Sequence, residues 1–268
     1  MSLYTVIGAG GFIGGRVRQR LDEAGAEVFA PARGDRDLFT RDLGRVVYCA
    51  GLTGDYREKP FEAVEAHVGL LARVLEQASF ERLVYLSSTR LYDSLAGGVG
   101  REDAALPLDP NQTHHVYELS KALGENLALN QSDGRGAVAR LSYVFDWADG
   151  AAGFLSEWLI RARASRSLLL NSSPSHARDY IHLDDVAGAL RAMLDQGDAG
   201  LVNVASGRTL TNGEVAEVFR RRGWTVAFTK EGQAVAPSAG VDVGRLARLG
   251  APARDVPGLI DSYLAALA

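Results

Sequence analysis

Tyr117 and Lys121 are the residues whose types and spacing could carry chemistry. With nine tyrosines and three lysines in 268 residues, chance supplies roughly 0.1 Tyr-x-x-x-Lys pairs, so the pair indicates a motif without proving one. On a helix, residues four apart share a face, so the phenol and the ammonium would point into the same space. A nearby cation favours the phenolate and lowers the pKa of a tyrosine, and such a phenol can exchange a proton with a sugar or alcohol oxygen. The alternative is an exposed helix that carries the pair by coincidence.

A glycine-rich turn could bind the phosphates of a dinucleotide. The sequence Gly8-Ala9-Gly10-Gly11-Phe12-Ile13-Gly14 closes an apolar run over residues 3–8 and opens a helical pattern over 12–24. A chain with this many glycines holds roughly 0.4 Gly-x-x-Gly-x-x-Gly patterns by chance, so the position of the motif carries the argument. Glycine lets the backbone approach a pyrophosphate, which the helix N-terminus favours electrostatically. We therefore predict dinucleotide binding here; a tight turn without a ligand is the alternative.

The end of the second expected strand bears on which dinucleotide binds. In NAD-binding folds an acid stands there to accept bonds from the ribose hydroxyls, whereas residues 27–31 are followed by Ala32 and Arg33. An arginine can pair with a 2′-phosphate, so Arg33 favours NADP over NAD. The alternative is that Arg33 is a solvated loop charge and that Asp35 or Asp37 reaches the ribose.

Strand-length apolar runs alternate with longer helical patterns along the chain. The alternation predicts an α/β fold with a parallel sheet and helices on both faces. The expected strands are residues 3–8, 27–31, 46–50, 82–87, 137–144, 167–170, 201–204 and 225–228. The expected helices are residues 12–24, 60–78, 113–131, 153–165, 183–195, 212–222 and 257–267. The glycine-rich segment 96–100 predicts a mobile loop.

Composition and charge narrow the classes of protein. Hydrophobic residues make up 47% and charged residues 23% of the chain, and the net charge is -4, which is ordinary for a globular protein. The chain has no basic stripe that would indicate nucleic-acid binding and no apolar run long enough to span a bilayer. Its N-terminus enters an apolar run without a basic segment, so we expect no signal peptide and a cytoplasmic location.

Cysteine and histidine placement argues against thiol or metal chemistry. Cys49 is the only cysteine and lies in the apolar run 46–50, which predicts a buried strand cysteine in a reducing compartment rather than a nucleophile. His114 and His115 are adjacent, which is poor spacing for two ligands on a helix, so we expect no metal site. We expect these histidines to shape the mouth of the pocket before Tyr117, or to face water.

Taken together, these features resemble the extended short-chain dehydrogenase/reductase family, in its NAD-dependent epimerase/dehydratase group, over most of the chain. In the first half, the resembling segments are the cofactor turn (8–14), a strand that ends in small residues (46–51), a serine-rich strand end (86–92) and the active-site helix (117–125). In the second half, they are a characteristic segment (178–186) and the strand and turn after it (202–207). The resemblance implies a Rossmann-type doubly wound parallel sheet with a small C-terminal substrate lobe. It places the dinucleotide-binding domain over residues 1–145, with 178–205 returning to it, and the lobe over 146–177 and 206–268.

The resemblance also implies roles for the reacting residues. Tyr117 would be the acid/base that takes or gives the hydroxyl proton while hydride moves to or from the nicotinamide. Lys121 would bind the nicotinamide ribose and lower the pKa of Tyr117. Ser88, four residues before Tyr92, would hydrogen-bond the substrate oxygen, and Thr89 could share or replace that role.

Binding residues and partners follow from the same resemblance. Arg178 resembles a residue that contacts the diphosphate of a nucleotide sugar; an ion pair with Asp184 or Asp185 is the equally open alternative. His182 is expected to be structural. The helices over 60–78 and 113–131 imply a homodimer. Besides Tyr117, Lys121 and Arg33, the implied cofactor contacts are Gly8, Gly10, Gly11, Phe12, Ile13, Gly14, Ala50 and Gly51.

The sequence departs from this family pattern in ways that bear on function. The connection between residues 31 and 46 is too short for the usual third strand and its helix, and the region after 204 is also short. Arg90 and Leu91 follow Ser88-Thr89, where 4,6-dehydratases of the family carry acids, so we discount dehydration. The leading hypothesis is an NADP-linked reductase of a keto group on a nucleotide-activated sugar. The alternatives are an epimerase that retains NAD and a noncatalytic redox sensor that binds the dinucleotide.

Overall fold

Within the residues that the computed structural model describes, which are 2–95, 97–112, 115–197, 200–232 and 238–267, six parallel strands form the central sheet. In spatial order they are β10 (Leu201–Val204), β6 (Gly136–Leu141), β4 (Arg82–Ser88), β3 (Arg45–Tyr48), β1 (Leu3–Ile7) and β2 (Glu27–Phe29). The strand order reverses between β1 and β3. Ligands of such sheets bind at this point, in the crevice outside the carboxyl ends of the strands. The Rossmann-type prediction is confirmed.

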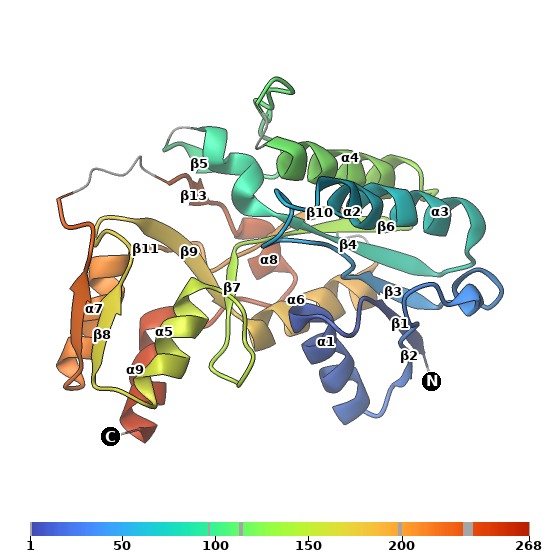
Figure 1. The fold of residues 1–268 in the computed structure, drawn as a ribbon. Coiled ribbons are helices and arrows are strands. Elements are labelled where there is room, and N and C mark those ends of the chain that lie inside the picture. Colours follow the sequence, from blue (N-terminus) through green and yellow to red (C-terminus); the bar gives the residue numbers. More distant parts are fainter. Residues whose placement is uncertain (1, 96, 113–114, 198–199, 233–237, 268) are drawn as a thin grey trace.

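Helices cover both faces of this sheet (Figure 1). The segments α2 (Pro60–Val64), α3 (Leu70–Gln77) and α4 (Val116–Asn130) lie on one face, and α1 (Phe12–Glu23) and α6 (Leu183–Gln196) lie on the other. Buried aliphatic side chains fill both layers, including Val17 and Leu190 under the sheet and Leu71 and Val74 above it. The strands read as near-continuous apolar runs because both of their faces are buried.

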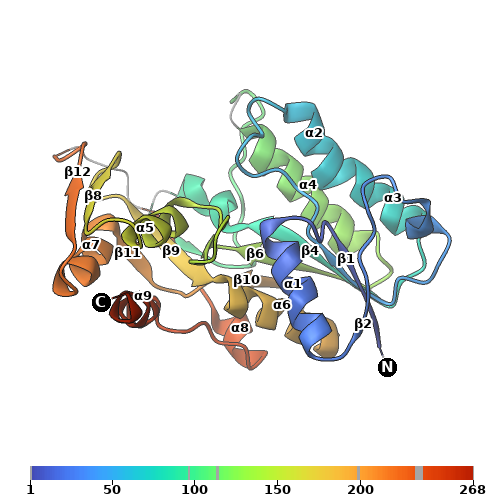
Figure 2. The same ribbon diagram turned by 60° about the horizontal axis from the view of Figure 1, so that its bottom comes forward.

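A smaller lobe stands beside the sheet, at the end away from the N-terminus (Figures 1 and 2). It contains α5 (Phe154–Ala162), α7 (Asn212–Arg221), α9 (Val256–Ala266) and the paired strands β8 (Ser167–Leu170) and β12 (Thr225–Phe228). These elements share a core of their own around Trp158 and Phe219. A second small sheet holds β7 (Tyr143–Phe145), β9 (Ala177–His182) and β11 (Thr209–Thr211).

The predicted strand over 137–144 is wrong in one respect. It divides at Ser142, because β6 pairs with β4 in the central sheet whereas β7 pairs with β9 in the small sheet. An apolar run does not reveal a change of pairing partner. The strand β9, which contains the Arg178-Asp179-Tyr180 segment, was also not expected as a strand.

The predicted helix over 60–78 contains a π-helical turn, η2 (Glu65–Gly69), between α2 and α3. π-turns of this kind often occur at functional sites, and this one carries the buried His67. The predicted helix over 113–131 begins at Val116 in α4, and residues 113–114 lie outside the described residues.

Two further predictions need correction. Val99–Gly100 form β5, which pairs with β13 (Gly240–Val241), so this part of segment 96–100 is a strand rather than a loop; Ala96 lies outside the described residues. Cys49 follows β3 instead of lying in it and is only partly buried. Burial still raises the pKa of its thiol to about 12, which argues against a nucleophile. Among its described residues, the short connection after β2 contains a 3-10 turn, η1 (Arg36–Phe39), and an isolated bridge from Asp42 to Ser79.

Candidate active site

The glycine turn is closely packed at Gly8 and Gly14 and open at Gly10. Gly8 has φ +90, and a Cβ on it would lie 2.9 Å from the backbone nitrogen of Ala50. A Cβ on Gly14 would lie 2.3 Å from the Gly8 carbonyl oxygen, so α1 can approach β1 only because this residue lacks a side chain. At Gly10, by contrast, an added Cβ meets nothing within 4 Å.

The start of α1 suits an anion. Its N-cap is Gly11, and among the described residues no side chain caps the helix and no acid stands in its first turn. The first N–H groups of the helix, including those of Phe12 and Ile13, are therefore left without a side-chain acceptor. These residues fit the phosphates of a dinucleotide, and they are the ones that would hold it.

Tyr117 lies at the start of α4, buried to 3% exposure. Burial raises its pKa above the ordinary 10.0, while hydrogen bonding from the Ser88 hydroxyl, the charge of Arg90 and hydrogen bonding from the Thr53 hydroxyl lower it in part. The pKa of this phenol is thus raised, and not lowered as the sequence predicted. The pKa is raised because the phenol is buried and because the Lys121 ammonium is directed to the Leu86 carbonyl.

Lys121 is also buried, at 5% exposure, one helical turn from Tyr117. Its ammonium donates to the Leu86 carbonyl at 2.8 Å and lies 4.9 Å from the ring centroid of Tyr85. A Cβ on Gly51 would lie 3.4 Å from the same nitrogen. Burial lowers the pKa of Lys121 from 10.5 to about 7. The lysine therefore stands between β4 and the segment after β3, beside the predicted cofactor contacts Ala50 and Gly51.

The two hydroxyls at the end of β4 point to different partners. The Ser88 hydroxyl lies near enough to Tyr117 to lower the pKa of the phenol in part, and it accepts from the Arg90 backbone N–H at 3.2 Å. Thr89 instead donates to the Leu141 carbonyl at 3.3 Å, which ties the strand end to β6. Of the two predicted candidates, Ser88 is the one brought to the phenol.

Several groups around Tyr117 were not expected from the sequence. The Tyr56 ring centroid lies 5.1 Å and the His67 ring centroid 5.3 Å from that of Tyr117. His67 is held by Ser120 through Nδ1 at 2.8 Å, and burial, with Lys121 as a second cause, lowers its pKa to about 3. Loops at the carboxyl ends of parallel strands carry ligand contacts, a signal that could have drawn attention to Tyr56 after β3.

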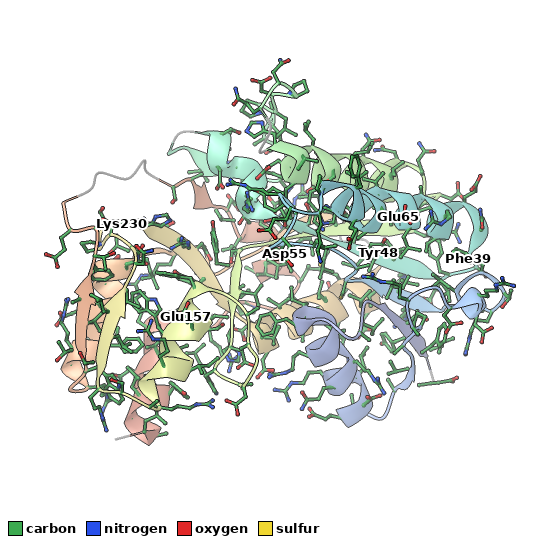
Figure 3. All side chains as sticks on the ribbon, viewed as in Figure 1. Phe39, Tyr48, Asp55, Glu65, Glu157 and Lys230 are labelled. Carbon is green, nitrogen blue, oxygen red and sulfur yellow. The ribbon has the colours of Figure 1, made fainter. Side chains whose placement is uncertain are left out.

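The connection that carries Thr53 and Tyr56 runs from β3 to α2. Figure 3 places Asp55 of this connection on the side of the sheet nearer to Glu157 of the lobe, and Phe39 at the far end of the molecule. Asp55 of the connection from β3 to α2 therefore lies on the lobe side of the sheet.

Arg178 lies on β9 with its guanidinium between aromatic rings. The guanidinium carbon is 4.9 Å from the Phe154 ring centroid and 5.1 Å from that of Tyr143. Its Nε and Nη1 are buried and have no hydrogen-bond partner among the described residues. The alternative of an ion pair with Asp184 or Asp185 is wrong, because those acids pair elsewhere, with Arg16 and Arg20 and with Arg254 respectively.

His182 and Arg33 complete the predicted set. His182 is buried and its Nδ1 accepts from the Asp184 N–H at 3.1 Å, so it caps α6, a structural role. Arg33 is exposed after β2, and Arg36 and Arg41 of the same connection are exposed as well. Asp35, one alternative ribose ligand, already accepts from the Asp37 N–H at 3.0 Å.

Among the residues that the structure describes, no group of three or more His, Cys, Asp or Glu side chains could hold a metal ion. No helix among the same residues is long and apolar enough to cross a membrane. His114, one of the paired histidines, lies outside the described residues, and His115 contacts Asp109.

Comparisons with known structures reach nearly the whole chain. The fold matches that of MoeE5 in complex with UDP-glucose and NAD, with a TM-score of 0.78, 24% identity and coverage of 99% of this chain and 98% of that one. It also matches RMD from Pseudomonas aeruginosa complexed with NADPH, with a TM-score of 0.74, 19% identity and coverage of 100% and 99%. At these identities the matches establish a shared fold.

Comparisons with known sequences also identify the family. The chain is 24% identical over 254 residues to a dTDP-4-dehydro-6-deoxy-D-allose reductase of Streptomyces sp, covering 79% of this chain and 78% of the reductase. The family model described as NAD dependent epimerase/dehydratase family matches residues 4–205, which include the glycine turn, Ser88, Tyr117, Lys121 and Arg178. With its glycine turn opening α1 and its tyrosine and lysine one turn apart on α4, the chain belongs to the NAD dependent epimerase/dehydratase family.

Proposed function

We propose that the protein is an NADP-linked reductase that reduces a keto group of a nucleotide-activated sugar. The observation that carries the proposal is the gathering of Ser88, Tyr117 and Lys121 at the carboxyl end of β4, beside the glycine turn. The similarity to a dTDP-4-dehydro-6-deoxy-D-allose reductase supports this reaction class.

Each residue has a part in the proton transfer. The Ser88 hydroxyl donates to the substrate carbonyl oxygen and positions it beside the phenol. Tyr117 holds its proton at neutral pH, because burial raises its pKa, and gives that proton to the same oxygen as the alcohol forms. When bound, NADPH supplies the hydride. Lys121, directed between β4 and Gly51, would bind the nicotinamide ribose.

Arg178 supports a nucleotide diphosphate as the handle of the substrate. Its buried Nε and Nη1 have no hydrogen-bond partner among the described side chains and backbone. A guanidinium fork matches two phosphate oxygens, and the rings of Tyr143 and Phe154 flank it. Leaving two buried donors unpaired is costly, which supports a ligand at this position.

The choice of NADP rests on Arg33. Its exposed guanidinium follows β2, where the ribose of the adenosine half would lie, and Arg36 and Arg41 add positive charge nearby. A 2′-phosphate is a fitting partner for these groups.

An epimerase that retains NAD is the second candidate. MoeE5, which shares the fold at 24% identity, is known with UDP-glucose and NAD together, and the same Ser88, Tyr117 and Lys121 would serve an oxidation followed by a reduction.

A homodimer through α2 and α4 is also proposed, supported by Phe61 at 88% and Leu123 at 50% exposure on those helices. A monomeric mass by light scattering would contradict the dimer.

One experiment separates the two functions. The purified protein is screened by thermal shift against NADPH, NADH, nucleotides and nucleotide sugars, since a ligand raises the melting temperature by mass action. Consumption of added NADPH with a dTDP- or UDP-linked keto-sugar is then followed. Stoichiometric NADPH loss with formation of the alcohol supports the reductase. Bound NAD in the purified protein, with sugar interconversion and no NADPH loss, would favour the epimerase.

A further inference from the structure

The guanidinium of Arg90 lies over the ring of Tyr117. Its guanidinium carbon lies 4.7 Å from the Tyr117 ring centroid and 5.2 Å from that of Tyr56. Its Nη2 donates to Glu118 at 2.7 Å and to the Tyr56 hydroxyl at 3.1 Å. The arginine is thus held on one side by the residue next to Tyr117 and on the other by the loop after β3.

This cation is held close to the phenol by contacts on two sides. Glu118 is 8% exposed and the Arg90 side chain 23% exposed, so the pair is mostly desolvated and its charges act strongly on nearby groups. Tyr56 is buried at 4% exposure, and its hydroxyl also accepts from Arg57 at 3.1 Å. A guanidinium over a tyrosine ring is attracted by the ring face, and more so once the ring carries a phenolate charge.

Lys121 does not take this role in the structure. Its ammonium is bonded to the Leu86 carbonyl and faces Tyr85. The causes that bring down the pKa of Tyr117 against the rise from burial include Arg90, while Glu118 acts in the opposite direction. Within the described chain, the titratable or charged groups around Tyr117 come from α4, η3 (Thr89–Leu95), η2, β4 and the loop before α2. They are Glu118, Lys121, Arg90, His67, Tyr85 and Tyr56. Asp93, also in η3, interacts with Arg90 and Glu118.

We infer that Arg90 is a positioning residue for the proton transfer: clamped by Glu118 and Tyr56, it holds the Tyr117 side chain and stabilises the phenolate left when the hydroxyl gives up its proton. The inference deepens the proposed function and rests on it. Glu118 has the opposite effect to Arg90, because its negative charge disfavours the phenolate of Tyr117.

The test compares substitutions that change these charges with opposite expected signs. Arg90→Met removes the cation, Glu118→Gln removes the anion and keeps the shape, and Arg90→Lys restores the charge. Arg57→Met is the matched control, because Arg57 contacts Tyr56 and lies one ring further from Tyr117. The first readout is the pH profile of kcat for oxidation of the alcohol product, which requires the phenolate. The second is the 13C NMR titration of the Tyr117 Cζ in unliganded, tyrosine-labelled protein, assigned with Tyr117→Phe.

The expected results follow from the charges. Loss of an opposite charge at this range moves a midpoint by about one pH unit or more, so Arg90→Met should move the Tyr117 midpoint to higher pH. Glu118→Gln should move it to lower pH, Arg90→Lys should return most of the Arg90→Met change, and Arg57→Met should leave it near the wild-type value.

Unchanged midpoints in both Arg90→Met and Glu118→Gln would overturn the inference, and so would shifts of the same sign. If Arg90→Met fails to fold, because it leaves Glu118 buried and unpaired, the Glu118→Gln arm decides. If no nucleotide sugar turns over, the proposed function fails, whereas the NMR titration of Tyr117 still decides the role of Arg90.

Discussion

Lys121→Met is expected to make the protein more stable at neutral pH. The ammonium is buried and bonded to a backbone carbonyl, and burial lowers its pKa from 10.5 to about 7. A pKa difference of this size corresponds to about 4 kcal/mol of lost stability near pH 7, at about 1.4 kcal/mol per pKa unit. Methionine removes this cost but leaves the Leu86 carbonyl without its donor, which costs about 1–3 kcal/mol. The net gain is about 2 kcal/mol, or about 5 °C in Tm for a chain of this size.

The pH dependence of this gain has a definite sign. Below pH 7 both the folded and the unfolded chain carry the proton, so the full cost applies. Between about pH 7 and about pH 10.5 the folded protein releases the proton while the unfolded chain keeps it, so the free energy of unfolding rises with pH. Near pH 10 the cost has fallen below about 1 kcal/mol. The lost hydrogen bond then dominates, and Lys121→Met becomes neutral or destabilising.

The assay is urea or thermal unfolding of wild type and Lys121→Met at several pH values. Lys230→Met is the matched control, because Lys230 is exposed on the lobe (Figure 3), where a substitution changes stability by at most about 0.5 kcal/mol. A Lys121→Met protein that is less stable than wild type near neutral pH would refute the reasoning. A stability difference that does not change with pH would refute it as well.

Further substitutions test other parts of the account. Arg33→Ala should weaken NADPH by about tenfold or more and NADH little, as measured by fluorescence titration, because only NADPH offers a 2′-phosphate; equal losses contradict the assignment. Gly14→Ala should destabilise the fold by about 1–3 kcal/mol, since its Cβ would meet a backbone oxygen at 2.3 Å. Gly10→Ala, with nothing within 4 Å, should keep its Tm and lose dinucleotide affinity; unchanged affinity contradicts the pyrophosphate site. Glu125→Gln should cost about 3–5 kcal/mol in urea unfolding, because it breaks the buried bidentate pair with Arg140.

The sequence predicted the parts of the site whose signals are local. The glycine turn lies within one strand–helix connection, and Tyr117 and Lys121 lie within one helix. Their positions follow from strand alternation and helical period alone. The short connection after β2 was also predicted, because a strand and a helix need a minimum length of chain.

Contacts between distant segments were not predictable in this way. Arg90 reaches Glu118 and Tyr56 only because η3, α4 and the loop after β3 meet at one edge of the sheet. The raised pKa of Tyr117 also depends on this packing, since burial is a property of the assembled fold. The division at Ser142 depends on which strand pairs with which, and an apolar run carries no such information.

The most direct test of the central claim is Tyr117→Phe, which removes one oxygen and keeps the ring that packs against Tyr56 and His67. Turnover of the keto-sugar should fall by about 10²-fold or more, as when an acid/base is removed, while NADPH affinity and Tm should stay close to wild type. Turnover that persists at the wild-type rate with cofactor bound would contradict the claim that this phenol gives the proton.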